Sequence, residues 1–286
     1  MKVEPILNIE NTKLGEGPVW NYQTQELLWV DIPNGLLHTC NLKTKTRTTD
    51  SFGQMLGAAI PCDDGSLLLA MQNGFAFFNP KTKELQKLTD PESHLPLNRF
   101  NDGKCDPAGR LWAGTMATDP PRDALGSLYR LDADLRVTKM LSDIKVSNGL
   151  AWTKAADKMF YIDTRQFKMM SFDYDLATGN IENQQDFLVF DGELPDGMTI
   201  DENDNLWVCF YLGGKVVCYD STTGKELEVI RIPALCTTSC TFGGEDLDTL
   251  FITTGAKEGD ELGGTLFGVK PGVKGRKVDF FKTNHS

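Results

Sequence analysis

The chain has 286 residues and a formal net charge of −11, from 29 lysines and arginines against 40 aspartates and glutamates. This surplus of acid argues against a protein that binds nucleic acid or an anionic membrane surface, because both carry negative charge themselves. A chain of this length can bury roughly three quarters of its unfolded surface. We therefore expect one domain, residues 1–286, whose core needs no disulfide bond.

The N-terminal sequence MKVEPILNIE lacks the basic and apolar segments of a signal peptide, and no apolar run is long enough to span a membrane. The seven cysteines are odd in number and lie mostly inside apolar runs, which indicates reduced and buried thiols. The sequence therefore predicts a cytoplasmic protein without a membrane segment.

Short apolar runs bounded by turn residues dominate the chain, for example ELLWVDI (26–32), RLWAGTM (110–116) and NLWVCFY (205–211). These runs are rich in β-branched and aromatic residues, which favour strands. Few windows of helical length escape a Gly, a Pro or an Asn/Asp turn. An all-β fold is therefore expected.

A turn followed by an apolar strand recurs along the chain with a period of about 45 residues. The copies are residues 23–31, 63–71, 107–115, 155–163, 202–210 and 246–254. A period of this length, with about four short strands in each copy, is typical of a propeller blade. Six copies fill the chain and predict a six-bladed β-propeller, since a seventh blade would have no residues to form it.

Two terminal segments are candidates for closing the ring. Residues 3–9 form a strand without a blade of their own, and we expect them to supply an outer strand to the sixth blade. Residues 277–281 compete for the same role. The recurring residues Trp112, Trp152 and Trp207 occupy blade positions, so we expect them to pack between blades.

Each repeat is preceded by a segment expected to line the central channel: residues 14–20, 55–61, 100–106, 146–152, 194–200 and 237–243. Four of these segments have a carboxylate or carboxamide directly before a glycine, namely Glu16, Asp102, Asn148 and Asp196. A single Asp-Gly or Asn-Gly pair is most often a turn. Here the repeat places all four at equivalent points of different blades, so the side chains are expected to converge at one mouth of the channel.

Converging carboxylates repel one another unless a cation neutralises them. Oxygen donors from Glu, Asn and Asp suit Ca²⁺, Mg²⁺ or Mn²⁺, whereas Zn²⁺ would lack the His and Cys ligands it prefers. One divalent cation, Ca, Zn, Mn or Mg, is therefore expected in the channel.

Several motifs together resemble one known family. They are LGEGPVW (14–20), NRFNDGKCDPAGRLWAGTM (98–116), SNGLAW (147–152), PDGMTID (195–201) and TTSCTFGG (237–244). In this order they are similar to the regucalcin (senescence marker protein), gluconolactonase and luciferin-regenerating enzyme family, and most of all to its regucalcin-like branch. The resemblance implies a six-bladed propeller with one channel cation and a metal-dependent lactonase activity on sugar lactones such as gluconolactone.

Residue by residue, the resemblance implies that Glu16, Asn148 and Asp196 are the metal ligands. It also implies that Arg99 and Asn101 hold the substrate, with Asn101 near the ion. The loop after GTMA (114–117) is shortened relative to the family, and Asp119 stands where family members have a substrate-contacting glutamate. Pro120 and Pro121 follow it in this loop, so the rim of the pocket is expected to differ.

This set of residues suggests how a lactone would be opened. A divalent cation polarises the carbonyl as a Lewis acid, while Asp196 serves as the catalytic general base that takes the proton of the attacking water. Arg99 is suited to sugar hydroxyls or developing negative charge. The expected partner is a small lactone, with no nucleic acid or membrane, and the chain is expected to be a monomer or weak dimer.

Two other functions remain open at this point. One is a calcium-binding regulatory protein of the regucalcin type without significant hydrolysis, in which the ion is structural. The other is a phosphotriesterase-like hydrolase, since the same ion polarises a P=O bond. A scaffold of the WD type is disfavoured because the chain lacks the Gly-His and Trp-Asp signatures of those repeats.

Overall fold

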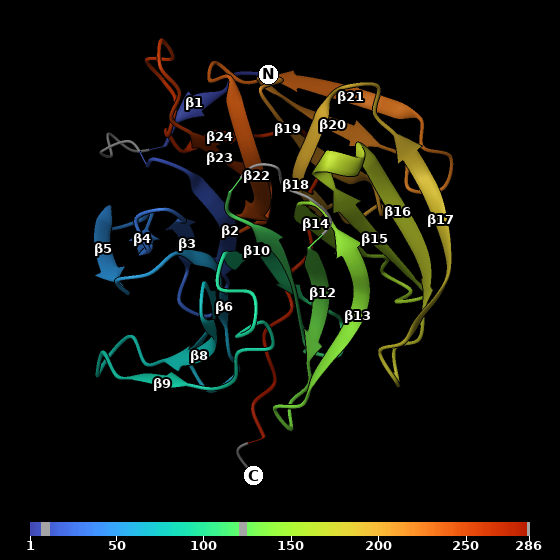
Figure 1. Ribbon diagram of the computed structural model, residues 1–286. Helices are drawn as coiled ribbons and strands as arrows, with labels where there is room; N and C mark the ends of the chain where they lie inside the picture. The colour runs from blue at the N-terminus through green and yellow to red at the C-terminus, as the bar shows by residue number, and fades with distance from the viewer. Residues whose placement is uncertain (7–11, 120–124, 285–286) are drawn as a thin grey trace.

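The computed structural model describes residues 1–6, 12–119 and 125–284. Six four-stranded antiparallel sheets stand around a central channel, as the sequence predicted (Figure 1). Within the described residues the single helical element is a 3₁₀ turn, η1 (Thr164–Gln166). In this part of the chain no helix is long and apolar enough to cross a membrane.

In blades 1 to 5 the strands follow one another from the channel outwards. Blades 1 and 2 comprise β2 (Gly15–Asn21), β3 (Glu26–Asp31), β4 (Leu36–Asn41), β5 (Thr46–Ser51), β6 (Leu56–Pro61), β7 (Leu67–Met71), β8 (Gly74–Phe78) and β9 (Leu85–Lys87). Blades 3 and 4 comprise β10 (Asn98–Cys105), β11 (Leu111–Ala117), β12 (Gly126–Leu131), β13 (Val137–Ile144), β14 (Ser147–Trp152), β15 (Lys158–Asp163), β16 (Lys168–Tyr174) and β17 (Ile181–Val189). Blade 5 comprises β18 (Leu194–Ile200), β19 (Leu206–Tyr211), β20 (Lys215–Tyr219) and β21 (Glu226–Arg231).

The sixth blade joins the two ends of the chain. It contains β22 (Cys236–Gly243), β23 (Thr249–Gly255), β24 (Phe267–Val269) and, as its outer strand, β1 (Glu4–Pro5). Strand β1 pairs antiparallel with β24, which confirms the expected ring closure for the described part of residues 3–9. Residues 7–9 of that predicted strand lie outside the described residues.

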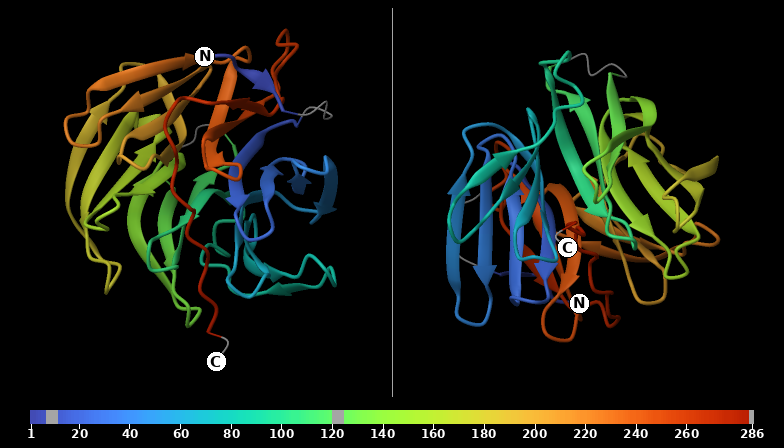
Figure 2. Two further views of the ribbon diagram at one scale, coloured as in Figure 1. Left: turned by 180° about the vertical axis from the view of Figure 1, so that it is seen from behind. Right: turned by 90° about the horizontal axis from the view of Figure 1, so that it is seen from below.

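The C-terminal tail, residues 277–281, adds no strand to a blade. It crosses the mouth of the channel at which the innermost strands end. There the Phe281 N–H donates to the carbonyl of Pro61, the last residue of β6, at 2.9 Å (Figure 2). The sequence could not separate these two roles, because both terminal segments have the same strand-like pattern.

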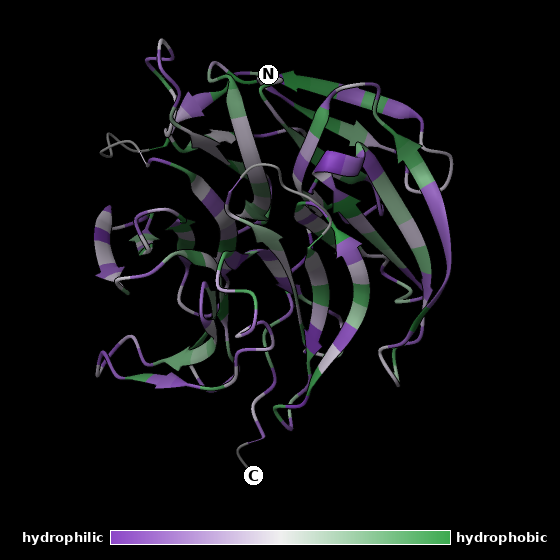
Figure 3. Ribbon diagram, in the orientation of Figure 1, coloured by the Kyte–Doolittle hydropathy of each residue, from purple (hydrophilic) through white to green (hydrophobic). Residues whose placement is uncertain are grey.

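Apolar side chains fill the space between neighbouring blades. The rings of Trp112 and Trp152 meet edge to face at 5.9 Å across blades 3 and 4, and Trp207 meets Phe242 at 5.9 Å across blades 5 and 6. The predicted role of the three tryptophans is therefore confirmed, and all seven cysteines are buried and free. Hydrophilic residues gather on outer strands such as β5 and β9, which face solvent (Figure 3).

A β-bulge interrupts every innermost strand near its beginning. The pairing register shifts at Glu16/Val19, Leu56/Ala58, Phe100/Gly103, Ser147/Leu150, Pro195/Met198 and Thr237/Ser239. A bulge leaves residues unpaired and redirects their side chains. The Asp-Gly and Asn-Gly pairs are thus bulges within strands and not turns between them.

The glycine of such a pair also leaves room for the next blade to pack closely against the innermost strand. A methyl group on Gly149 would lie 2.7 Å from Met198 Cγ and 2.9 Å from the carbonyl oxygen of Asp196. Only glycine lets blade 5 come this near to β14. The polar residue before the glycine is therefore held at the channel wall.

Candidate active site

A pocket of about 120 Å³ opens at the channel mouth where the innermost strands begin. Five of the six predicted site residues line it together: Glu16, Arg99, Asn101, Asn148 and Asp196. They come from β2, β10, β14 and β18, and all five side chains are buried. The convergence expected from the repeat is thus present for Glu16, Asn148 and Asp196. It is wrong for Asp102, which lines a separate hollow with Gly103 and Lys104.

Both carboxyl groups of the pocket have a raised pKa. Burial raises the pKa of Glu16 to about 8, with the nearby charge of Asp102 acting in the same direction. Burial and the charges of Glu16 and Asp102 raise the pKa of Asp196 well above its usual value. Ionising both acids is therefore costly unless a positive charge lies between them.

Glu16 and Asp196 differ in their hydrogen bonds. Glu16 Oε2 accepts the Gly17 N–H at 2.9 Å, which fixes one carboxylate oxygen against the backbone of its own bulge. The carboxylate of Asp196 has no hydrogen-bond donor among the described residues. Its two oxygens are consequently the freer pair in the pocket.

The amide of Asn148 has a single orientation that satisfies its neighbours. Thr164 donates its hydroxyl proton to the carbonyl of Pro195 at 2.6 Å, so its oxygen is left to accept from Asn148 Nδ2 at 2.7 Å. Because Nδ2 points to Thr164, the Oδ1 of Asn148 must lie on the other side of the amide. This assigns the oxygen as the atom presented to a ligand.

Arg99 and Asn101 continue this network on β10. Asn101 Nδ2 donates to the Ser147 carbonyl at 2.7 Å and to Asn148 Oδ1 at 3.1 Å. Asn101 Oδ1 accepts from Arg99 Nη1 at 2.7 Å. The two predicted substrate-binding residues are therefore linked to the predicted ligand Asn148 by direct hydrogen bonds.

The donor set fits a hard divalent cation. The described residues contain no group of three His, Cys, Asp or Glu side chains arranged to hold a metal, so the set consists of two carboxylates and the amide oxygen of Asn148. Oxygen donors of this kind suit Ca²⁺, Mg²⁺ or Mn²⁺. The mutual repulsion of Glu16 and Asp196 is the feature that such an ion would relieve.

Asp119 is the sixth predicted site residue and does not line the pocket. It is exposed in the segment after β11, and Pro120 and Pro121 of the same loop lie outside the described residues. Its contact with a substrate stays a prediction.

Sequence reasoning missed three residues that line the pocket, namely Thr164, Arg165 and Tyr211. Thr164 and Arg165 belong to η1 and follow the repeated segment 155–163, in a stretch without an equivalent in the other blades. Tyr211 is the last residue of β19, and in the sequence it cannot be told apart from the other aromatic residues of that strand. No motif singled them out.

Comparison with known proteins identifies the family of the chain. A family model described as the SMP-30/Gluconolactonase/LRE-like region matches residues 14–256, which is most of the chain. The chain belongs to this family. The matched region of the SMP-30/gluconolactonase/LRE-like family includes every predicted site residue, Asp119 among them.

Three relatives illustrate the similarity. A protein named "Putative sugar lactone lactonase YvrE" from Bacillus subtilis is 38% identical over 86% of this chain and 84% of its own length. The structure of a luciferin-regenerating enzyme has a TM-score of 0.93 and 32% identity, over 98% of this chain and 99% of that one. A structure from Agrobacterium tumefaciens, described as a calcium-binding protein, regucalcin, has a TM-score of 0.90 and 27% identity, over 97% and 96%.

Proposed function

We propose that the protein is a metal-dependent hydrolase that opens sugar lactones. The observation that carries the proposal is the convergence of Glu16, Asn148 and Asp196 in a pocket that also contains Arg99. The name of the Bacillus subtilis relative, a putative sugar lactone lactonase, supports the same reaction class.

In this proposal Glu16, Asn148 and Asp196 hold one divalent cation. When bound, such an ion supplies a Lewis acid for the lactone carbonyl. Asn148 contributes a neutral oxygen whose orientation Thr164 fixes. Glu16 contributes charge from a carboxylate that Gly17 holds in place.

Asp196 is the proposed general base. Asn148 has no basic site, and one oxygen of Glu16 accepts a hydrogen bond from the Gly17 N–H. Asp196 is therefore the carboxylate whose oxygens accept no hydrogen bond from the described residues. It would accept a proton from the attacking water and return it to the ring oxygen as the ester bond breaks. A neighbouring cation lowers the pKa of an acid, so it would keep Asp196 ionised despite its burial.

Arg99 and Asn101 are proposed to bind the sugar. Arg99 Nη1 donates to Asn101 Oδ1 and to the Phe100 carbonyl, which holds the guanidinium at the pocket wall, where a positive charge is suited to hydroxyl groups or a developing oxyanion. Asp119, on the exposed segment beyond β11, is proposed to contact the far end of a substrate.

The test is a hydrolysis screen. Chelator-treated protein is given Ca²⁺, Mg²⁺, Mn²⁺ or Zn²⁺ in turn and assayed on gluconolactone, other aldonolactones, an alkyl lactone and a phosphotriester. The proposal expects sugar lactones to be hydrolysed with at least one metal and not after chelation. Hydrolysis of the phosphotriester alone would favour the phosphotriesterase-like alternative.

A calcium-binding protein without hydrolysis is the second candidate, favoured by the description of the Agrobacterium tumefaciens structure. The two candidates differ in whether the ion has coordination positions open to a substrate. Calcium binding without turnover of any lactone in the screen would select this candidate. In either case we propose a cytoplasmic protein, a monomer or weak dimer, that binds no nucleic acid or membrane.

A further inference from the structure

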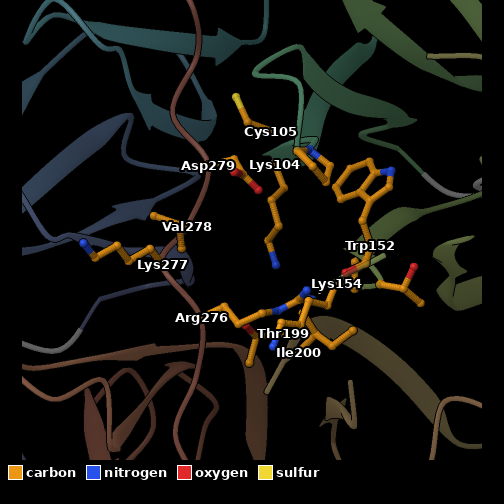
Figure 4. Close-up of a pocket in the computed structure, with 13 residues that line it drawn as sticks. Lys104, Cys105, Trp152, Lys154, Thr199, Ile200, Arg276, Lys277, Val278 and Asp279 are labelled. Carbon is orange, nitrogen blue, oxygen red and sulfur yellow. Dashed lines mark hydrogen bonds between the residues drawn. The ribbon is translucent and has the colours of Figure 1, made fainter. Parts of the chain in front are cut away.

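A second cavity, of about 230 Å³, lies at the opposite mouth of the channel (Figure 4). Its lining includes Lys104, Trp152 and Thr199 with Ile200, at or near the ends of β10, β14 and β18. The candidate active site takes residues from near the beginnings of the same three strands. The two hollows are therefore at opposite ends of the channel.

The C-terminal segment closes one side of this cavity. We call residues 274–282 the C-terminal strap. At one end the Lys274 carbonyl accepts from Glu202 N at 2.9 Å, and at the other the Lys282 N–H donates to the Gly109 carbonyl at 3.0 Å. Residues 276–279, between these anchors, line the cavity. The strap is thus tied to blade 5 and to blade 3 and spans the mouth between them.

Two cationic side chains converge in the cavity, one from the channel wall and one from the strap. Figure 4 shows the Lys104 ammonium and the Arg276 side chain reaching into the same space. Lys104 Nζ donates to the Met198 carbonyl at 2.7 Å, which leaves two of its three protons for other acceptors. Arg276 Nη2 donates to the Trp152 carbonyl at 2.6 Å, and its Nη1 lies 3.4 Å from Asp204 Oδ1.

Lys104 and Arg276 are two like charges in a buried place, as Glu16 and Asp196 are at the other mouth, and their pKa values are shifted toward the neutral form. Burial lowers the pKa of Lys104, and the charge of Arg276 acts in the same direction, although Asp102 opposes both. Burial also lowers the pKa of Arg276, against the charges of Asp204 and Asp279. Two partly desolvated cations side by side are stabilised by an anion placed between them.

The lining as a whole is basic in a strongly acidic protein. It contains Lys104, Lys154 and Arg276 against one carboxylate, Asp279, whereas the Lys277 ammonium points away from the cavity over the ring of Tyr22. Thr199 adds a hydroxyl that has no hydrogen-bond partner among the described residues. Charged donors and a free hydroxyl are the groups that recognise the oxygens of an anion.

We propose that this cavity is a binding site for a small oxyanion, a carboxylate or a phosphate, held between Lys104 and Arg276 with a hydrogen bond from Thr199. The site is separate from the proposed lactonase chemistry and does not depend on it. The cavity has room for inorganic phosphate or for a small organic acid.

Calorimetric titration of the metal-loaded protein tests the proposal. Inorganic phosphate and acetate are the two probes, each compared with chloride at equal ionic strength. We expect saturable binding of one ion per chain for at least one probe and none for chloride, and the stronger probe identifies the anion class. Loss of a charge-assisted hydrogen bond costs about tenfold in affinity or more, which is the effect expected for Arg276→Gln and Lys104→Met.

Lys277→Gln is the matched control. It removes one positive charge from the same strap, but the Lys277 ammonium lies 4.9 Å from the centre of the Tyr22 ring and points away from the cavity in Figure 4. The affinity of this variant for the anion should change by less than about twofold, since the exposed Lys277 charge is turned away from the cavity and is screened by salt.

Glu16→Gln separates the two mouths. If this change abolishes anion binding and Arg276→Gln does not, the anion sits on the metal at the other mouth and the proposal is overturned. Absence of saturable binding by both probes overturns it equally. Should Lys104→Met fail to fold, Arg276→Gln decides, with amide hydrogen exchange as a second measurement. Bound anion should slow exchange across residues 274–281 in the wild type and not in this variant.

Discussion

Asn148 Nδ2 donates a hydrogen bond of 2.7 Å to Thr164 Oγ1, and this contact, together with the bond from Asn101 Nδ2 to Asn148 Oδ1, decides which atom of the amide faces the channel. Thr164 in turn is fixed by its own bond to the Pro195 carbonyl on the next blade. A residue outside every motif therefore orients a residue inside one.

Thr164→Val tests this relationship. Valine keeps the shape but removes the acceptor, so Asn148 Nδ2 is left unpaired in a buried position or the amide rotates its oxygen away from the channel. Either outcome costs about 1–3 kcal/mol, which corresponds to roughly a tenfold loss of metal affinity or more. Metal titration of Thr164→Ser, which retains the hydroxyl, serves as control and should resemble the wild type. Equal metal affinity in Thr164→Val and the wild type would contradict the role assigned to Thr164.

Glu16→Gln should weaken the response of the melting temperature to added metal. An ion that binds only the folded chain raises its stability with the logarithm of the ion concentration above Kd. Glutamine removes a negative ligand, so the rise should begin at higher concentration. Asp119→Asn removes an acidic charge from an exposed position and should leave the response unchanged. Unaltered melting of the wild type after chelation would show that the proposed metal site is wrong.

Asp196→Asn should lose about 10²-fold or more in kcat, the usual scale for a general base. The amide keeps the size and one oxygen ligand but has no basic oxygen. The assay is run at saturating metal, with occupancy confirmed by metal analysis, and Asp196→Ala should lose metal binding as well. Near-normal turnover of the metal-occupied Asp196→Asn variant would show that Asp196 is not the general base. Asp102 would then be the next carboxylate to test.

Arg99→Ala should lower kcat/KM more for polyhydroxylated lactones than for alkyl lactones, because the Arg99 guanidinium lines the pocket and is proposed to bind hydroxyl groups. Metal affinity should stay nearly intact. Arg231→Ala, at an exposed position on the outer strand β21 and outside the pocket lining, is the matched control for loss of an arginine and should leave both substrate classes unchanged. An equal loss on both substrate classes would count against hydroxyl recognition.

Asp119→Ala should change the ranking of sugar lactones by kcat/KM without changing metal affinity. Asp119 is exposed after β11 and outside the pocket lining, so it can reach only the distal part of a substrate. An unchanged ranking over the whole panel would remove Asp119 from the substrate-binding set.

The stability of the metal-free protein should fall as the pH rises from about 4.5 to about 8. The pKa of Glu16 rises from 4.5 to about 8 on folding, so between these values the folded chain holds a proton that the unfolded chain has lost. The unfolded state then binds fewer protons, and stability decreases with pH. Melting temperatures in chelator should show this slope for the wild type and a shallower one for Glu16→Gln. Metal affinity should rise over the same interval, because metal and proton compete for the carboxylate.

The repeat made the fold predictable. Strands in a propeller pair mainly with their sequence neighbours, so the period of about 45 residues, counted on positions such as Trp112 and Phe160, fixes the number of blades without any knowledge of long-range contacts. The same count placed Glu16, Asn148 and Asp196 at equivalent points of three blades, and the pocket contains all three.

The bulge geometry and the hydrogen bonds of the site could not be predicted from the sequence. Asp-Gly and Asn-Gly pairs have the same composition in turns and in bulges, and only strand pairing shows that they are bulges here. The Nδ2 of Asn148 donates to Thr164, whose hydroxyl is held by blade 5. A hydrogen bond between blades depends on positions that no sequence period records.

The sequence by itself thus determined the six-bladed fold, the channel strands and the polar residues that converge at one mouth, because all of these follow from residue types repeated at a fixed interval. Only the tertiary structure decided which way the Asn148 amide faces, that β1 closes the ring, and that residues 274–282 cross the far mouth and bring Arg276 to Lys104. Each of these features depends on contacts between segments far apart in the chain. Such contacts are selected by packing and by the need to pair buried polar groups, and neither leaves a periodic trace in the sequence.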